Sequence, residues 1–168
     1  IFMKFLYSWL KELAKFKESP QRIAELLTLH SFEVESVEKA GDDFVLDVAL
    51  LPNRVADASG HEGLAREIAA ITNEKLKIKN EKPQLKIKND TNKWLEVKIE
   101  NKDDCRRYIG IVMDGVTVKE SPEWMRHRLE LCGLQSINNL VDAANYVMVE
   151  MGQPLHIFDF EKIENAQI

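Results

Sequence analysis

The sequence predicts an α+β fold, in which a small N-terminal α/β domain precedes the first part of a second, α+β domain. Short runs of alternating apolar residues, typical of strands, are interspersed with longer runs that have helical spacing. A lysine-rich stretch over residues 75–93 separates two halves that are otherwise of ordinary globular composition. These observations predict domains at residues 1–74 and 94–168, with the lysine-rich stretch between them.

The first half begins with a predicted strand over residues 3–7, followed by a short helix with Ser8 as its N-cap. Ser19 and Pro20 repeat the helix-start signal, because a capping hydroxyl precedes a proline at the first helical position. The helix that follows places three apolar side chains on one face: Ile23, Leu26 and Leu27.

Two alternating segments, residues 32–37 and 44–50, predict strands joined by a turn at residues 41–43. The loop of residues 51–54 leaves the second strand. Ser59 and Glu62 have the spacing of a capping box, which predicts the start of another helix. That helix has a core stripe and ends near Asn73; the stripe consists of Leu64, Ile68 and Ile71.

The stretch of residues 75–93 contains seven lysines against Glu81 and Asp90, and it repeats the pentad Leu-Lys-Ile-Lys-Asn on either side of Pro83. It is predicted to be either a linker or an exposed hairpin. A solvated linker is one interpretation of its charge, and contact with an RNA backbone is the other. The lysines considered for RNA contact are Lys77, Lys79, Lys86 and Lys88.

The second half begins with predicted strands over residues 94–99 and 108–113. Ser121-Pro122-Glu123 predicts a helix that Gly133 ends. Asn138 or Asn139 starts the next helix, which Gly152 ends, and Pro154 prevents its continuation.

Composition limits the classes of function. The net charge of −5 gives no general basic surface for nucleic acid, so RNA contact would need a local patch. Cys105 and Cys132 are isolated, which argues against a disulfide framework or zinc site and favours reduced thiols in the cytosol. No apolar run approaches membrane-spanning length. Phosphate-binding glycine motifs are absent, and His61-Glu62 lacks the second histidine of a zinc-protease helix, so no metal site is expected.

The most informative stretch spans residues 136–159, where amides, a histidine and carboxylates lie among apolar residues. Amide and neutral imidazole groups both donate and accept hydrogen bonds, so such a set can hold a polar ligand group or orient a water molecule. The alternative is structural, with asparagines that cap a helix and a histidine that is satisfied in the core.

The same stretch reads S-I-N-N-L-V-D-A-A-N-Y-V-M-V-E-M-G-Q-P-L-H-I-F-D. It resembles the β chain of bacterial-type phenylalanyl-tRNA synthetases, whose pattern is approximately P-I-N-N-x-V-D-x-T-N-Y-V-M-x-E-x-x-Q-P-x-H-A-F-D. Further segments support the resemblance, which covers nearly the whole chain as an N-terminal part of a longer protein: residues 7–11, 52–54, 63–67, 105–108 and 121–124.

The resemblance implies a cytoplasmic α₂β₂ enzyme, with no membrane association, whose α chain joins phenylalanine to tRNA using ATP and magnesium. This chain would then hold no catalytic residue for aminoacylation and no bound cofactor. Its implied roles are assembly with the α chain, tRNA binding and part of the hydrolytic editing of tyrosyl-tRNA, with residues 94–168 as the first part of the editing domain. The alternative is a non-catalytic RNA-binding or assembly module that reuses the fold.

By motif position, the resemblance implies that Asn145 and His156 line the editing pocket. Ala144 stands where the family has a threonine, so one hydroxyl of the pocket is missing. The family's oligonucleotide-binding barrel is also expected to be absent, because only residues 38–43 separate the two strands between which it is usually inserted.

Overall fold

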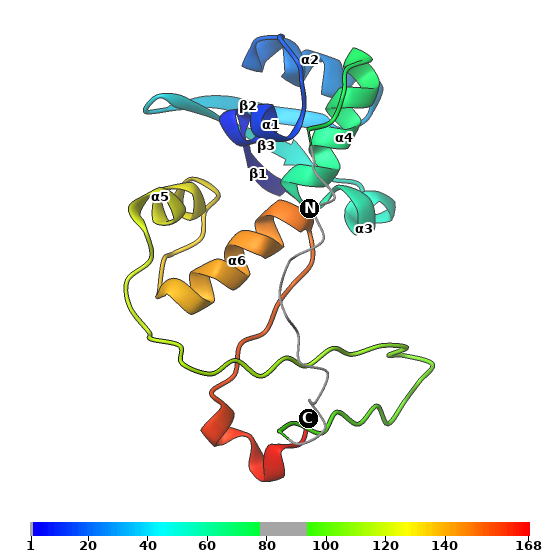
Figure 1. The fold of residues 1–168 in the computed structure, drawn as a ribbon. Coiled ribbons are helices and arrows are strands. Elements are labelled where there is room, and N and C mark those ends of the chain that lie inside the picture. Colours follow the sequence, from blue (N-terminus) through cyan, green and yellow to red (C-terminus); the bar gives the residue numbers. More distant parts are fainter. Residues whose placement is uncertain (1, 78–93) are drawn as a thin grey trace. The chain divides into compact units, whose positions relative to one another are not determined.

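The computed structural model describes residues 2–77 and 94–168, and its fold is α+β, as predicted (Figure 1). The chain forms two compact units. Unit 1 is described over residues 2–77 and 119–155, and unit 2 over residues 94–118 and 156–168. Among the described residues, no helix has both the length and the apolar character needed to cross a membrane.

Unit 1 contains a three-stranded antiparallel sheet with the strand order β1-β3-β2. The strands are β1 (Phe2–Leu6), β2 (Glu33–Ala40) and β3 (Asp43–Ala49). A two-residue turn at Gly41 and Asp42 joins β2 directly to β3, and Gly41 adopts a positive φ of 61°, which glycine allows without steric cost. A β-bulge between Val34 and Ser36 interrupts the alternation of β2.

Each face of the sheet carries its own core, because successive side chains on a strand point to opposite faces. Phe5, opposite Leu46, joins the core formed with α1 (Tyr7–Leu13), α2 (Pro20–His30) and α4 (His61–Thr72). Leu6, opposite Val45, joins a second core with α5 (Glu123–Leu131) and α6 (Asn139–Met151). Figure 1 shows these two helices on the side of the sheet opposite α2.

The compact units therefore differ from the boundaries expected from the sequence. Residues 119–155 belong to unit 1 because the apolar faces of α5 and α6 cover a sheet face formed by the first half of the chain. A compact unit need not coincide with an inherited domain, so the limits 1–74, 75–93 and 94–168 stay a prediction. Residues 78–93, which make up most of the predicted lysine-rich segment, lie outside the described residues.

Several predicted helix ends are confirmed. Ser19 caps α2 by accepting a hydrogen bond from the Arg22 N–H, and Pro20 is its first helical residue. Asn73 ends α4 in the left-handed region, and Gly152 ends α6 in the same way. Asn138, rather than Asn139, is the N-cap of α6.

Two predicted caps are wrong. Ser8 lies inside α1, where its hydroxyl and N–H both donate to the Asp43 carboxylate across the sheet. Gly60 precedes α4 without a side-chain cap, and Glu62 pairs instead with Arg66 one turn later, at 3.0 Å. In both cases a tertiary or helical partner competes successfully for the side chain. The loop before α4 contains η1 (Pro52–Arg54) and α3 (Val55–Ala58).

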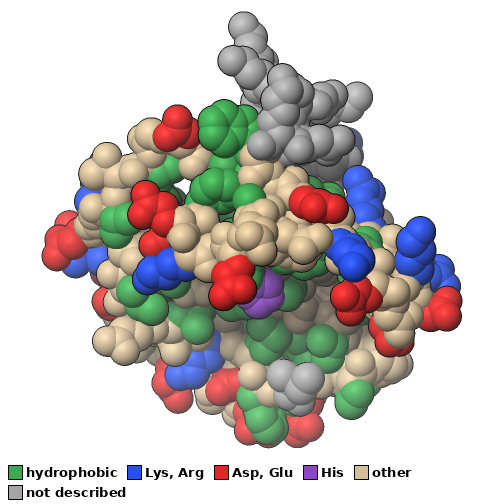
Figure 2. All heavy atoms as spheres, turned by 90° about the horizontal axis from the view of Figure 1, so that it is seen from below, with side chains coloured by type: hydrophobic (Ala, Val, Ile, Leu, Met, Phe, Trp, Pro, Cys, Tyr) green, Lys and Arg blue, Asp and Glu red, His purple; other side chains and the backbone are tan. Residues whose placement is uncertain are grey.

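The prediction of strands over residues 94–99 and 108–113 is wrong, because in the described part of unit 2 neither segment forms a strand. The described pairing is a single bridge between Glu96 and Gln167, beside the short helices η3 (Phe160–Lys162) and η4 (Glu164–Ala166). An extended segment becomes a strand only when a neighbouring segment pairs with its N–H and C=O groups. Unit 2 also exposes large apolar side chains, including Trp94, Ile109 and Met113, and Figure 2 shows apolar groups at the surface among charged ones.

Candidate functional site

Helix α6 carries two of the three predicted pocket residues. Its N-terminus is closed by Asn138, whose side-chain oxygen accepts hydrogen bonds from the N–H groups of Leu140 and Val141, both at 3.0 Å. Such a cap satisfies donors that a helix start otherwise leaves unpaired. On this helix Ala144 is buried and Asn145 is half-buried.

Asp142 anchors the first turn of α6 in the unit. Its buried carboxylate accepts hydrogen bonds from the hydroxyls of Ser121 and Ser136 and from the Ile137 N–H, the last at 2.9 Å. Burial acts to raise the pKa of this carboxyl, but the hydrogen bonds that it accepts outweigh burial and hold the pKa below its usual value. The aspartate of the N-N-L-V-D segment is therefore an ionised structural anchor.

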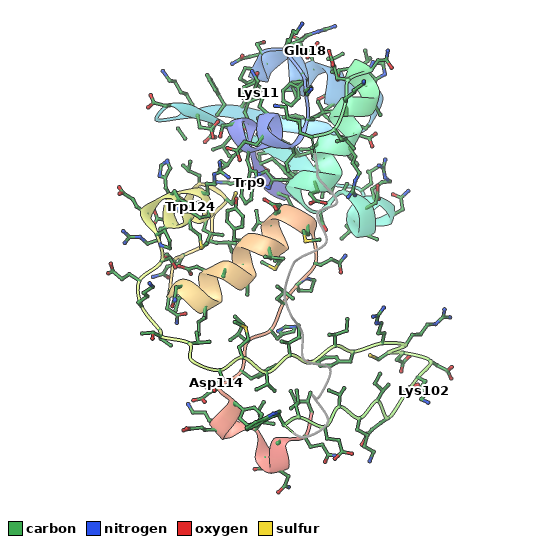
Figure 3. The ribbon with its side chains drawn as sticks, viewed as in Figure 1. Trp9, Lys11, Glu18, Lys102, Asp114 and Trp124 are labelled. Carbon is green, nitrogen blue, oxygen red and sulfur yellow. The ribbon has the colours of Figure 1, made fainter. Side chains whose placement is uncertain are left out.

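A stack of rings fixes the middle of α6 to α1. The ring of Trp9 lies between Tyr146, at 4.4 Å between centroids, and His61, at 4.1 Å. The Trp9 indole N–H donates to the Glu150 carboxylate at 2.9 Å, and Trp124 meets the edge of Tyr146. Figure 3 shows Trp9 and Trp124 on the side of the sheet that α5 and α6 cover.

Arg128 of α5 contacts two rings of the same stack, those of Trp9 and Tyr146. Its guanidinium lies 5.0 Å from the centre of the Trp9 ring, donates to the Tyr146 hydroxyl at 2.9 Å and pairs with Glu12 of α1. Hydrogen bonds to the carboxylate and the phenol raise the pKa of Arg128, although burial acts against them. Arginine suits this place because its planar fork stacks and donates at the same time.

The structure places the predicted pocket residues in different units. Ala144 and Asn145 belong to unit 1, and His156 belongs to unit 2, so each is described in its own unit. His156 is exposed, and its ring centre lies 6.3 Å from that of Phe158. The structural alternative of a core histidine does not hold, whereas the shared pocket stays a prediction.

The sequence suggested no role for Trp9, His61, Tyr146 or Arg128. Trp9 and Tyr146 are 137 positions apart, and no local pattern links them. The available signal was weak: Tyr7 and Trp9 lie close together at the start of α1, and Arg126 and Arg128 follow Trp124 in α5. His61 is satisfied at both ring nitrogens by the backbone, which leaves neither free to bind a metal.

The described residues form no competing metal site or hollow near α6. A hollow of about 310 Å³ lies in unit 2 and is lined by residues 97–101, Asp104, Cys105, Tyr108 and Ile168, without His156. No group of three or more histidine, cysteine, aspartate or glutamate side chains within the described ranges could hold a metal ion.

Of the four lysines considered for RNA contact, Lys79, Lys86 and Lys88 lie outside the described residues. Lys77 is exposed, and its ammonium donates to the Lys11 carbonyl at 2.6 Å. Its backbone N–H also donates to the Leu13 carbonyl at 2.7 Å. Lys77 is thus held against the start of the chain by its backbone and its side chain.

If the lysine-rich stretch contacts tRNA, as one of its two interpretations has it, replacing Lys79, Lys86 and Lys88 by glutamine should weaken tRNA binding and flatten its dependence on salt. Each lost phosphate contact reduces the slope of log affinity against log salt by about 0.7–0.9. Titrations at several ionic strengths measure this slope. The matched control replaces Lys17, Lys102 and Lys162 by glutamine; these three lysines are exposed and lie outside the lysine-rich stretch. Equal slopes for the two triple variants would assign the stretch to a linker.

Comparison with known proteins shows what this chain is similar to. A model of the B3/4 domain family matches residues 104–168. The phenylalanine–tRNA ligase β subunit of Rhodopirellula baltica is 38% identical over 165 residues, which cover 96% of this chain and 24% of the relative. That of Carboxydothermus hydrogenoformans is 41% identical over 136 residues (80% and 16%), and that of Thermotoga maritima is 42% identical over 137 (80% and 17%).

The match to the Rhodopirellula baltica relative covers nearly the whole chain, and the B3/4 match includes α6. The chain spans between 16% and 24% of the length of these three relatives. Its second half carries the B3/4 match, and the N-N-L-V-D and Q-P-L-H segments lie within that match. The chain therefore belongs to the family of phenylalanine–tRNA ligase β subunits.

Proposed function

We propose that this chain forms part of the editing site of a phenylalanine–tRNA ligase β subunit, where tyrosyl-tRNA is hydrolysed. The observation that carries the proposal is the way α6 is held. Asp142, Trp9 and Arg128 fix the helix at its start and middle, and Asn145 remains half-buried on it. A fixed helix with a partly accessible amide suits the orientation of a polar substrate group.

In this proposal His156 supplies the second polar group. An exposed imidazole can donate a hydrogen bond to, or accept one from, the tyrosyl group or the attacking water. A site that hydrogen-bonds the tyrosine hydroxyl discriminates strongly against phenylalanine, because its polar groups would stay unpaired. Phenylalanine charging, with ATP and magnesium, belongs to the α subunit in this proposal, and the chain assists assembly and tRNA binding.

The second candidate function is a non-catalytic RNA-binding or assembly module. Two observations favour it: Ala144 brings no hydroxyl to the proposed pocket, and unit 2 exposes large apolar side chains such as Ile111 and Phe158. Apolar surface of this kind is typical of contact with other protein. The two candidates differ in whether α6 variants alter hydrolysis or only binding.

The deciding experiment changes α6 in a ligase whose β subunit contains this sequence. Asn145→Ala is expected to slow tyrosyl-tRNA hydrolysis about tenfold, the effect of one lost hydrogen bond of about 1.4 kcal/mol, with phenylalanine charging unchanged. Ala144→Thr is expected to accelerate hydrolysis, by lowering its activation free energy by about 0.5–1.5 kcal/mol, if the threonine hydroxyl reaches the substrate.

Deacylation and charging rates measured on the same preparations test both changes. The control is Ala143→Thr, which adds the same side chain at an exposed position of α6. If Asn145→Ala alters tRNA affinity and leaves the hydrolysis rate as it was, the binding module is the correct function. If Ala144→Thr and Ala143→Thr behave alike, the threonine hydroxyl is bonded to its own helix, a known alternative for this residue.

We also expect the isolated 168-residue chain neither to charge tRNA with phenylalanine nor to deacylate tyrosyl-tRNA. Its sequence contains no phosphate-binding glycine motif, and Ala144 leaves the proposed pocket without one hydroxyl. Hydrolysis of tyrosyl-tRNA by the wild-type chain, compared with a His156→Ala chain, is the measurement. A difference between the two would contradict the expectation.

A further inference from the structure

The C-terminal turn of α6 is bound by a histidine from a distant part of the chain. A helix leaves its last carbonyl groups without partners inside the helix. Here the Val149 carbonyl lies 3.0 Å from Nδ1 of His61, the first residue of α4. The other ring nitrogen, Nε2, lies 3.0 Å from the backbone N of Leu6, at the end of β1.

This pair of contacts fixes the protonation state of the imidazole. The Leu6 N–H can only donate, so Nε2 accepts and carries no proton. The proton of the neutral ring is then on Nδ1, which donates to the Val149 carbonyl. One neutral side chain thus joins β1 and α6, and a doubly protonated ring could not accept from Leu6.

The surroundings of His61 disfavour the charged ring. Its side chain has no solvent exposure and lies against the rings of Phe5 and Trp9. The pKa of His61 is lowered to about 4, chiefly by burial and also by nearby Arg128, while the Val149 carbonyl and Asp43 act in the opposite direction. The other charged or titratable groups around the stack are Glu12, Tyr146 and Glu150.

The backbone beside His61 packs on the same turn of α6. A Cβ added to Gly60 would lie 2.4 Å from the Gly152 nitrogen and 2.6 Å from the Glu150 carbonyl oxygen, which only a glycine avoids. The Ser59 hydroxyl also donates to the Gly152 carbonyl, at 3.4 Å. Residues 59–61 therefore seat the end of α6 by backbone contact as well as by the ring.

We propose that His61 is a positioning residue for α6, whose Nδ1–H donates to Val149 and fixes the helix that carries Ala144 and Asn145 to the N-terminal sheet. The relevance of this contact to editing rests on the proposed function. The contact itself is a property of this chain and is testable without tRNA.

Two variants of similar polarity separate the two ring contacts. The side-chain amide of His61→Asn places a donor near the position of Nδ1, and that of His61→Gln places an acceptor near the position of Nε2. We expect the asparagine variant to keep the hydrogen-exchange protection of α6 amides, relative to those of α2, within about threefold of wild type. We expect the glutamine variant to lose about tenfold, the loss of one hydrogen bond of about 1.4 kcal/mol.

The pH profile supplies a readout that a merely structural role would not move. The pKa of His61 is about 4 in the fold, against 6.5 for a free imidazole. The neutral ring therefore stabilises the last turn of α6 fully above pH 6.5, and this stabilisation is lost as the pH falls towards 4. Protection of α6 relative to α2 should therefore decline over this range in wild type and less so in His61→Asn, which cannot titrate there. Nitrogen NMR shifts should show a neutral ring protonated at Nδ1.

A ring protonated at Nε2, equal α6 protection in the two variants, or an equal loss in α2 and α6 would each overturn the proposal. The proposed function fails separately. If the exchange results hold and Asn145→Ala leaves tyrosyl-tRNA hydrolysis unchanged in the whole enzyme, the positioning role stands and the editing role does not.

Discussion

Replacing Asp142 by alanine is expected to lower the free energy of unfolding of unit 1 by about 2–4 kcal/mol, because three hydrogen-bond donors lose a charged acceptor. The substitution leaves three donors without their acceptor: the buried Ser121 hydroxyl, the half-buried Ser136 hydroxyl and the Ile137 N–H. The gain in helix propensity from alanine is less than about 1 kcal/mol and offsets little of this loss.

Denaturant unfolding at pH 7 measures the effect, with Asp142→Asn and Glu130→Ala as comparisons. The asparagine keeps the shape with one accepting oxygen, so we expect a smaller loss of about 1–3 kcal/mol. Glu130 is exposed on α5, and its replacement should change stability by no more than about 0.5 kcal/mol. Similar losses for Asp142→Ala and Glu130→Ala would show that the carboxylate is no anchor.

The same comparison has a defined pH dependence. The pKa of Asp142 lies below its usual value in the fold, so its ionised form stabilises the fold above the unfolded-state pKa of 3.8. This contribution is lost as pH falls through the folded-state pKa. The difference in unfolding free energy between wild type and Asp142→Ala should therefore be largest near neutral pH and shrink in acid.

Replacing His156 by alanine is expected to slow tyrosyl-tRNA hydrolysis about 10–100-fold, as loss of a hydrogen bond of about 1.5–3 kcal/mol would. Phenylalanine charging should stay within about twofold, because the proposal assigns charging to the α subunit. His156 is exposed in its unit, so truncation should change the melting temperature little.

Deacylation, charging and melting temperature are measured on one preparation of a ligase whose β subunit contains this sequence. His127→Ala is the matched control, since it removes an exposed histidine of α5 that the motif does not include. A variant that loses both activities and its thermal stability together would place His156 in a structural role. If the His156→Ala variant hydrolyses tyrosyl-tRNA at the wild-type rate, His156 is not part of the editing site.

The sequence by itself determined the fold class and several of the helix ends. The signals at Ser19, Asn73, Asn138 and Gly152 depend on short-range hydrogen bonds and on backbone conformations that each residue type favours locally. The alternation in β1 and β3 likewise indicated strands, because a period of two needs no knowledge of distant residues. The family resemblance also came from the sequence, through a long run of matched positions.

Only the tertiary structure decided how those elements combine. It showed that α5 and α6 cover the sheet of the first half, that Ser8 bonds Asp43, and that Trp9 and His61 hold α6. It also left residues 94–99 and 108–113 without the strand pairing that their alternation indicated. Such contacts join residues dozens to more than a hundred positions apart, and their energy depends on burial and partner geometry, which no local spacing encodes.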